Sequence, residues 1–187
     1  MDWPKAKSFI IIALLVTDLV LGGALLGPRL KEDRAEREAA DNIRMYLEEQ
    51  GAELDCELPS YSRRLPVLFV SFGAQGSQPS ISGLSVSGGA LEYKGIPVVV
   101  EGGSSELPVV DSVGASKGDI RPSAYAAAEL AGDLLAGSDG DLSGLRISDV
   151  YLVYWLYNNG SDASDTAFPY WCFDTDDYLY YVSAYYE

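Results

Sequence analysis

Apolar residues concentrate in two parts of the chain, near its beginning and over its last third. Residues 9–26 form a largely apolar run that a few polar positions interrupt. At 1.5 Å per residue, a helix of that length reaches about 27 Å, close to the thickness of a hydrocarbon core. The pattern therefore predicts a transmembrane helix over residues 8–27, preceded by a short tip of residues 1–7.

A cleaved signal peptide is the alternative interpretation of this segment. Lys5 and Lys7 would form its basic start, and the small residues 22–24 would form a cleavage site. The apolar run continues through Leu25 and Leu26, which favours an uncleaved anchor. Basic residues are more numerous after the run than before it, so the positive-inside rule alone favours a cytoplasmic location for the domain that follows.

Asp18 lies near the middle of the apolar run, where a charge costs about 2.5–3.5 kcal/mol. Gly22 follows four residues later, so the two share one face of a helix. A small residue lets two helices approach closely, and a carboxyl group can bond across the contact. Asp18 and Gly22 are therefore candidate partner-binding residues. A polar residue that an anchor merely tolerates is an equally weighted alternative.

Beyond the apolar run, the pattern predicts two helices and a series of strands. Residues 28–51 predict a juxtamembrane helix that ends at Gly51 and docks its last turns on the domain. A second helix is predicted over 121–136. Strands are predicted at 53–58, 66–72, 90–93, 96–101, 107–111, 149–157, 168–173 and 178–185. The glycine- and serine-rich residues 73–89 predict a long loop or a poorly ordered hairpin.

These elements predict an α+β fold, in which helices pack on an antiparallel sheet within one domain over residues 52–187. The second half has one helix followed by three strands, the last two joined by the acidic turn 174–177. The first half loosely follows the same plan, which leaves two αβββ units as an option, although no residue-level repeat marks them.

The composition and charge of the chain limit the catalytic sites, metal sites and partners that it can have. The 187 residues include no histidine, which excludes Ser-His-Asp and Cys-His catalytic sites and zinc sites that need imidazole. Residues 1–44 carry seven basic and seven acidic side chains, so the net charge of −15 falls on residues 45–187. Such a domain repels nucleic acid and anionic lipid. We therefore expect no nucleic-acid partner, no cofactor and no enzymatic activity.

Carboxylates are the one remaining source of catalytic or metal-binding chemistry. Asp174, Asp176 and Asp177 carry carboxylates, which are the ligands that calcium prefers. They lack the spacing of a calcium-binding loop, however, and aspartate is common in hairpin turns. Any two carboxylates across a cleft can form a glycosidase-like pair, which keeps an acid-based hydrolase as a weak alternative. With 28 acidic residues in the chain, that signal discriminates little.

Two tryptophans and two cysteines are further candidates. Trp155 and Trp171 lie in tyrosine-rich predicted strands. Either they form a surface that binds a carbohydrate or a peptide, or they fill the core. The core is favoured for both. Cys56 and Cys172 close one disulfide in an extracytoplasmic domain, or they remain two buried thiols.

Short motifs at both ends of the chain are similar to one family. The chain opens with Met1-Asp2-Trp3, Lys5-x-Lys7 and an apolar span that holds Asp18. It closes with Val150-Tyr151 and Tyr154, then Phe168-Pro169-x-Trp171, then Tyr180-Tyr181-Val182-x-Ala184. Between them lie Asn42-Ile43 through Leu47, then Gly51 and Leu58-Pro59. Together these motifs resemble YycI-type regulatory proteins of Gram-positive bacteria, with a PepSY-like module at the C-terminal end. The resemblance does not cover residues 60–140.

The resemblance implies a single-pass protein of the cell membrane, with a cytoplasmic N-terminus and an extracytoplasmic, PepSY- or cystatin-like domain. Its implied role is to regulate the sensor histidine kinase of a two-component system for cell-wall homeostasis (WalK, also called YycG), together with a YycH-like sister regulator. In that family control runs through the transmembrane helix, where Asp18 and Gly22 would lie. The alternative function is a surface-tethered binding or peptidase-inhibitor module, in which the aromatic sheet makes the contacts.

Overall fold

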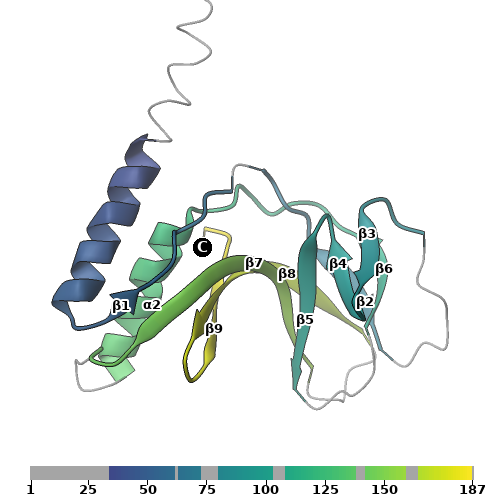
Figure 1. Ribbon diagram of the computed structural model, residues 1–187. Helices are drawn as coiled ribbons and strands as arrows, with labels where there is room; N and C mark the ends of the chain where they lie inside the picture. The colour runs from purple at the N-terminus through teal and green to yellow at the C-terminus, as the bar shows by residue number, and fades with distance from the viewer. Residues whose placement is uncertain are drawn as a thin grey trace, which may run out of the picture. The chain divides into compact units, whose positions relative to one another are not determined.

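The computed structural model describes residues 34–61, 63–72, 80–102, 108–137, 142–158 and 164–186 (Figure 1). Internal contacts divide the chain into two units, Met1–Asp41 and Asn42–Glu187. Within the described ranges, no helix combines the length and the apolar character that crossing a membrane requires. The predicted transmembrane helix over 8–27, with Asp18 and Gly22, lies outside the described residues and stays a prediction.

The first described helix covers residues 34–49. In its last turns, which belong to the larger unit, Ile43 and Leu47 are buried. The chain leaves the helix at Gly51, where φ is 81°, and the Ala52 N–H returns to the Leu47 carbonyl at 2.9 Å. Glycine adopts this left-handed backbone without the steric cost of a side chain. The last turns therefore pack within the larger unit.

A second helix and a set of strands make up the remaining regular structure. The strands are β1 (Glu53–Leu54), β2 (Leu68–Ser71), β3 (Leu84–Ser87), β4 (Ala90–Tyr93), β5 (Ile96–Gly102), β6 (Val109–Val113), β7 (Arg146–Asn158), β8 (Ser164–Thr175) and β9 (Leu179–Ser183), with the helix α2 (Ser123–Gly137) between β6 and β7. Most of them coincide with predicted runs. β3 is an exception, because it lies in the segment that predicts a loop or a poorly ordered hairpin.

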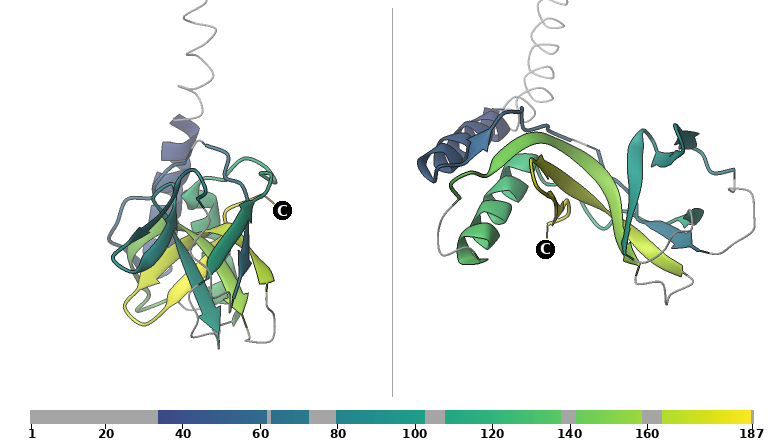
Figure 2. Two further views of the ribbon diagram at one scale, coloured as in Figure 1. Left: turned by 90° about the vertical axis from the view of Figure 1, so that its right-hand side faces the viewer. Right: turned by 60° about the horizontal axis from the view of Figure 1, so that its bottom comes forward.

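β7 and β8 are the central pair of a nine-stranded sheet, and both are long and bent (Figures 1 and 2). The strand order is β3-β4-β5-β7-β8-β2-β6, with β1 joining β7 and β9 joining β8. β7 pairs antiparallel with β8 but parallel with both β1 and β5. The chain between β5 and β7 contains β6 and α2, and a crossover of this length lets two strands run parallel.

The predicted fold class is therefore wrong. We expected helices packed on an antiparallel sheet, in one or two αβββ units of PepSY or cystatin type. The described residues instead form mostly one large mixed sheet with two helices, of which α2 contacts the sheet at β9. The reason is physical: periodicity locates a strand and its faces, but β5 finds its parallel partner only after a long crossover that no local pattern encodes.

Much of the core lies on one face of β7 and β8, although Val153 and Cys172 on the opposite face are also buried. Residues that pair directly across two strands share a face, and successive residues of a strand alternate between faces. The buried residues on this face are Val150, Leu152, Tyr154 and Leu156 of β7 with Ala167, Pro169, Trp171 and Phe173 of β8. Trp171 is 1% exposed, and its indole N–H donates to the Arg121 carbonyl at 2.9 Å. Trp171 is thus a core residue.

Arg121 also joins α2 to the sheet. Its Nε donates to the Ser183 carbonyl of β9 at 2.6 Å, and its guanidinium pairs with the carboxylate of Glu129 in α2. The buried side of α2 carries small side chains with helical spacing, including Ala124, Ala127 and Ala131. Small side chains let the helix axis approach its neighbours closely, so α2 is buried with little side-chain volume.

Candidate functional site

The face of β7, β8 and β9 opposite the core carries aromatic side chains that stay partly exposed. The register aligns Tyr151, Cys172 and Tyr181 across the three strands. We define the aromatic face as Tyr151, Trp155 and Tyr157 of β7, Phe168 and Tyr170 of β8, and Tyr181 of β9. Tyr157 is 59% exposed, and the other members are half-buried. Aromatic side chains with this degree of exposure are typical of interaction surfaces.

Trp155 makes two ring contacts within the aromatic face. Its ring centroid lies 5.5 Å from that of Tyr181 in a stacked arrangement and 5.0 Å from that of Tyr170 at a tilt of 59°. Its indole N–H is buried and has no hydrogen-bond partner among the described residues. A buried donor without a partner costs about 1–3 kcal/mol. Trp171 is fully buried, whereas Trp155 is half-buried.

Cys172 lies beneath two of the tyrosines. It is 1% exposed, and its thiol shares hydrogen bonds with the hydroxyl groups of Tyr151 and Tyr181. Burial raises the pKa of the Cys172 thiol despite these bonds. Burial, followed by the charge of Asp149, also raises the pKa of the half-buried Cys56. Both cysteines are free. Thiols with raised pKa values are weak nucleophiles at neutral pH, so neither cysteine has the properties of a catalytic residue.

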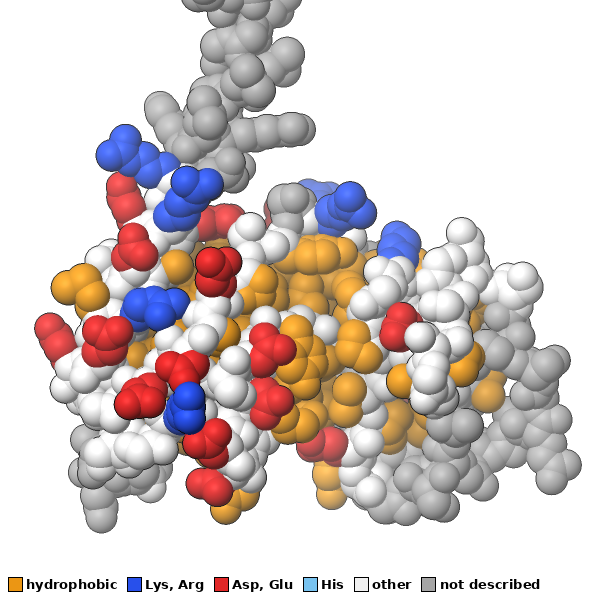
Figure 3. All heavy atoms as spheres, in the orientation of Figure 1, with side chains coloured by type: hydrophobic (Ala, Val, Ile, Leu, Met, Phe, Trp, Pro, Cys, Tyr) orange, Lys and Arg blue, Asp and Glu red, His pale blue; other side chains and the backbone are white. Residues whose placement is uncertain are grey.

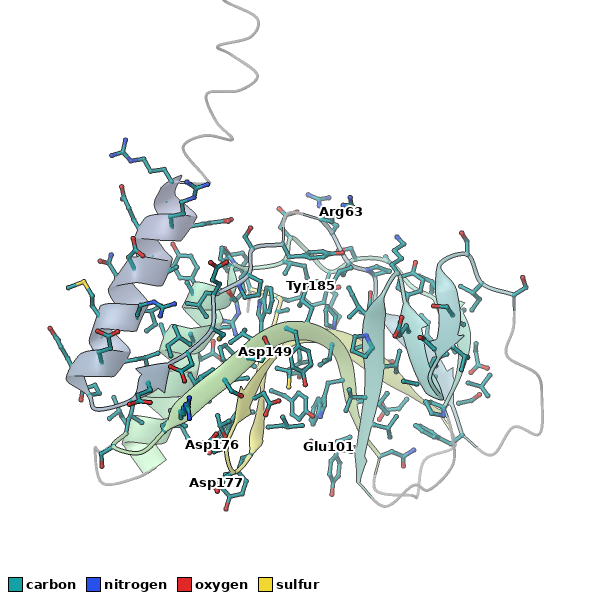
Figure 4. The ribbon with its side chains drawn as sticks, in the orientation of Figure 1. Arg63, Glu101, Asp149, Asp176, Asp177 and Tyr185 are labelled. Carbon is teal, nitrogen blue, oxygen red and sulfur yellow. The ribbon has the colours of Figure 1, made fainter. Side chains whose placement is uncertain are left out.

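Carboxylates border the aromatic face. The Tyr181 side chain lies close to the Glu101 carboxylate of β5, and burial followed by nearby Cys172 and Glu101 raises the pKa of Tyr181. Burial is also the main cause of the raised pKa of Tyr151, to which Asp174 and Asp149 contribute. Figure 4 shows Asp149 on β7 and Glu101 on β5. The surface therefore combines aromatic rings with negative charge.

The acidic turn between β8 and β9 is a separate feature. Asp176 and Asp177 lie at the tip of this hairpin (Figure 4), and both are exposed. The turn is closed by its own groups, since the Thr175 N–H donates to the Tyr178 carbonyl at 3.0 Å. Searching the described ranges finds no group of three or more acidic or cysteine side chains that could hold a metal ion. A cavity of about 250 Å³ lies beside the turn and also borders Arg146.

The sequence singled out Trp155 but not its neighbours as a set. Tyr151 and Tyr157 lie at even spacing from Trp155, so alternation within β7 alone groups these three on one face. Tyr170 and Tyr181 join them only through the register of β8 and β9, which no single strand reveals. Asp18 and Gly22 lie outside the described residues, so the structure does not relate them to this face.

Comparison with known proteins yields no match at the level of a protein-family model, a curated protein or a solved structure. The resemblance to YycI-type regulators stays a prediction that rests on the short motifs alone.

Proposed function

We propose that this chain is a non-catalytic binding module that holds a partner protein on its aromatic face. The observation that carries the proposal is the group of half-buried rings around Trp155, whose buried indole N–H lacks a partner among the described residues. Tryptophan and tyrosine dominate the binding energy of protein interfaces because they bury large rings with few rotatable bonds. The exposed Tyr157 extends this surface.

Binding is favoured over catalysis by the side chains at hand. The chain has no histidine to act as a general base, and burial raises the pKa values of both thiols. The acidic border formed by Glu101 and Asp149 selects against anionic partners and suits a cationic protein surface. The net charge of −15 acts in the same direction at longer range.

The identity of the partner belongs to the same proposal. The motifs at both ends suggest regulation of a sensor histidine kinase from the outer side of the cell membrane, with a YycH-like protein as second partner. In this proposal residues 8–27 anchor the chain, and Asp18 and Gly22 pack against a neighbouring helix. Regulation also requires that the contact prefers one state of the kinase over the other.

The test is co-purification of the full-length chain in mild detergent from its native membrane, with partners quantified by mass spectrometry. Tyr157→Ala and Tyr125→Ala form a matched pair, because the two tyrosines are 59% and 52% exposed but only Tyr157 belongs to the aromatic face. We expect Tyr157→Ala to reduce recovery of the kinase or sister regulator about fivefold or more, as for the loss of an interface aromatic residue. Tyr125→Ala should leave recovery unchanged.

Equal recovery with both tyrosine variants would remove the aromatic face from the proposal. If the unchanged chain recovers neither a sensor kinase nor a second single-pass regulator, the kinase is excluded as its partner. Asp18→Leu in a membrane two-hybrid assay measures the anchor separately, and unchanged association there would exclude Asp18 from the contact.

A further inference from the structure

One edge of β7 is open in its middle. β1 pairs with β7 at Arg146 and Ile147, and β5 pairs with the same edge from Tyr154 onward. Among the described residues, no strand pairs with residues 148–153 on this edge. At about 3.3 Å per residue, the open stretch is about 20 Å long. Figure 1 shows β1 and β5 on either side of it.

The backbone groups at this open edge follow from the pairing of β8. The Thr175 N–H donates to the Tyr178 carbonyl, and the Pro169 carbonyl accepts from the Ala184 N–H, so these residues of β8 face β9. Trp171 has the same parity and also faces β9, because backbone groups alternate along a strand. Its partner Leu152 on β7 therefore directs its N–H and C=O away from β8, into the open stretch.

The neighbouring residue Val150 has the same orientation, and its N–H is satisfied locally. It donates to the Oδ1 atom of Asp149 at 2.8 Å. For the backbone of Leu152, no described residue supplies a bond on this side. The Leu152 side chain is only 9% exposed, so this backbone lies in a sheltered position. Sheltered N–H and C=O groups need partners, and another strand is the partner whose geometry fits an open edge.

A groove lies beside this edge and can receive side chains. Its volume is about 290 Å³, and its lining includes Pro59, Ile96, Val150, Tyr151 and Leu152. The lining is mostly apolar. Figure 3 shows hydrophobic side chains gathered between β1 and β5, with acidic side chains along the border toward β1. In strand addition, main-chain bonds provide affinity and such pockets select side chains.

The charge around the open edge indicates which kind of peptide can bind there. Asp149 is exposed at the open edge itself, and the domain around it is strongly acidic. A basic side chain on the added strand can pair with Asp149 while its neighbours enter the apolar groove. We infer that the open edge of β7 between β1 and β5 binds an extended, basic peptide segment as an additional β-strand. This inference rests on the proposed function in taking the chain as a binding module, but it uses the adjoining edge of β7, which shares Asp149 and Tyr151 with the aromatic face and its border.

The first test needs no ligand. Hydrogen exchange of the full-length chain in mild detergent should protect the amides of Tyr151 and Val153, which face β8, and leave the Leu152 amide much less protected. Equal protection of all three amides would overturn the inference, because it would mean that the edge is already occupied, for example by another segment of this chain.

The second test uses a capped six-residue peptide in which valine alternates with lysine and threonine. We expect it to bind, to slow exchange of the Leu152 amide, and to bind about tenfold more weakly when its alternate amides are N-methylated and can no longer donate. The same peptide with glutamate in place of lysine should bind more weakly still. Binding that ignores N-methylation, or that leaves the Leu152 amide unprotected, would overturn strand addition.

A matched pair of variants tests the role of charge. Asp149→Asn keeps a side-chain oxygen for the Val150 N–H but removes the charge. Asp165→Asn is the control, since Asp165 bonds the Thr166 N–H in the same way, at 2.6 Å, in β8. We expect Asp149→Asn to weaken binding of the lysine peptide about fivefold and to reduce its salt dependence, and Asp165→Asn to change neither. Equal effects would exclude Asp149 as the recognition residue.

The two proposals fail separately. If Tyr157→Ala abolishes partner recovery while the peptide does not bind, the aromatic face stands and the open edge is only guarded by Asp149 against unwanted pairing. If the peptide binds while Tyr157→Ala has no effect, strand addition stands and the aromatic face does not.

Discussion

The two faces of the β7–β8 pair carry equally large aromatic side chains in opposite environments. On the core face, Trp171 is 1% exposed and its indole N–H is bonded to the Arg121 carbonyl. On the aromatic face, Trp155 is half-buried and its indole N–H has no described partner. The core face also leaves the Tyr154 hydroxyl without a described partner, so the contrast rests on the exposure of the rings rather than on hydrogen bonding alone. The difference suggests that one face serves stability and the other serves binding.

Among the tests of this comparison, alanine substitution of the two tryptophans has the largest expected effect. Trp171→Ala should lower the free energy of unfolding by about 3–5 kcal/mol, since it opens a cavity in the core and leaves the Arg121 carbonyl unbonded. Trp155→Ala should cost only about 1–2 kcal/mol, because its ring is only partly buried in the native chain. Denaturant titration followed by circular dichroism measures both. Equal losses would mean that Trp155 is as much a core residue as Trp171.

A smaller effect separates two buried tyrosines of the core side. The Tyr185 hydroxyl donates to the Leu65 carbonyl, whereas the Tyr154 hydroxyl is buried without a partner among the described residues. Tyr185→Phe should therefore cost about 1 kcal/mol of unfolding free energy. Tyr154→Phe should be neutral or slightly stabilising, because it removes an unsatisfied group without changing the ring. A clear loss for Tyr154→Phe would show that its hydroxyl does have a bonding partner.

The smallest expected effect is on the fall in stability at alkaline pH, compared between the unchanged chain and a tyrosine variant. Burial raises the pKa values of Tyr151, Tyr154 and Tyr181 in the folded chain, while tyrosine in an unfolded chain ionises near pH 10. The folded state therefore holds more protons than the unfolded state above that pH, and stability falls as the pH rises. Tyr181→Phe should make this fall less steep. Phenolate absorbance that reaches its full amplitude while the circular dichroism stays native would contradict the prediction.

Much of the strand pattern was predictable because it depends on local chemistry. The apolar runs located β7, β8 and β9, and the acidic turn between the last two was expected from its composition. Lys94, in the left-handed region with φ of 53°, and Gly95, with φ of 79°, form the tight turn between β4 and β5, the strands predicted at 90–93 and 96–101. β3 was missed because its residues are small and mostly exposed, so no alternation of apolar and polar side chains marks them.

The pairing of distant strands was not predictable, and the candidate site depends on it. Alternation within β7 groups Tyr151 with Trp155, but it cannot tell which of the two faces becomes the core. That choice is made by α2, by Arg121 and by the register of β8, which are all set by tertiary packing. The open edge of β7 was equally hidden, since it depends on where β1 and β5 stop pairing.

The central position of β7 also constrains the order in which the chain can fold during synthesis. β1 and β5 leave the ribosome well before β7, yet both depend on β7 for their parallel pairing. The β3-β4-β5 hairpins can form early because their contacts are local. The edge of β5 that pairs with β7 stays unpaired until the chain beyond Arg146 has left the ribosome. A ribosome that stalls before that point would therefore hold a nascent chain with an exposed strand edge, a substrate for chaperones.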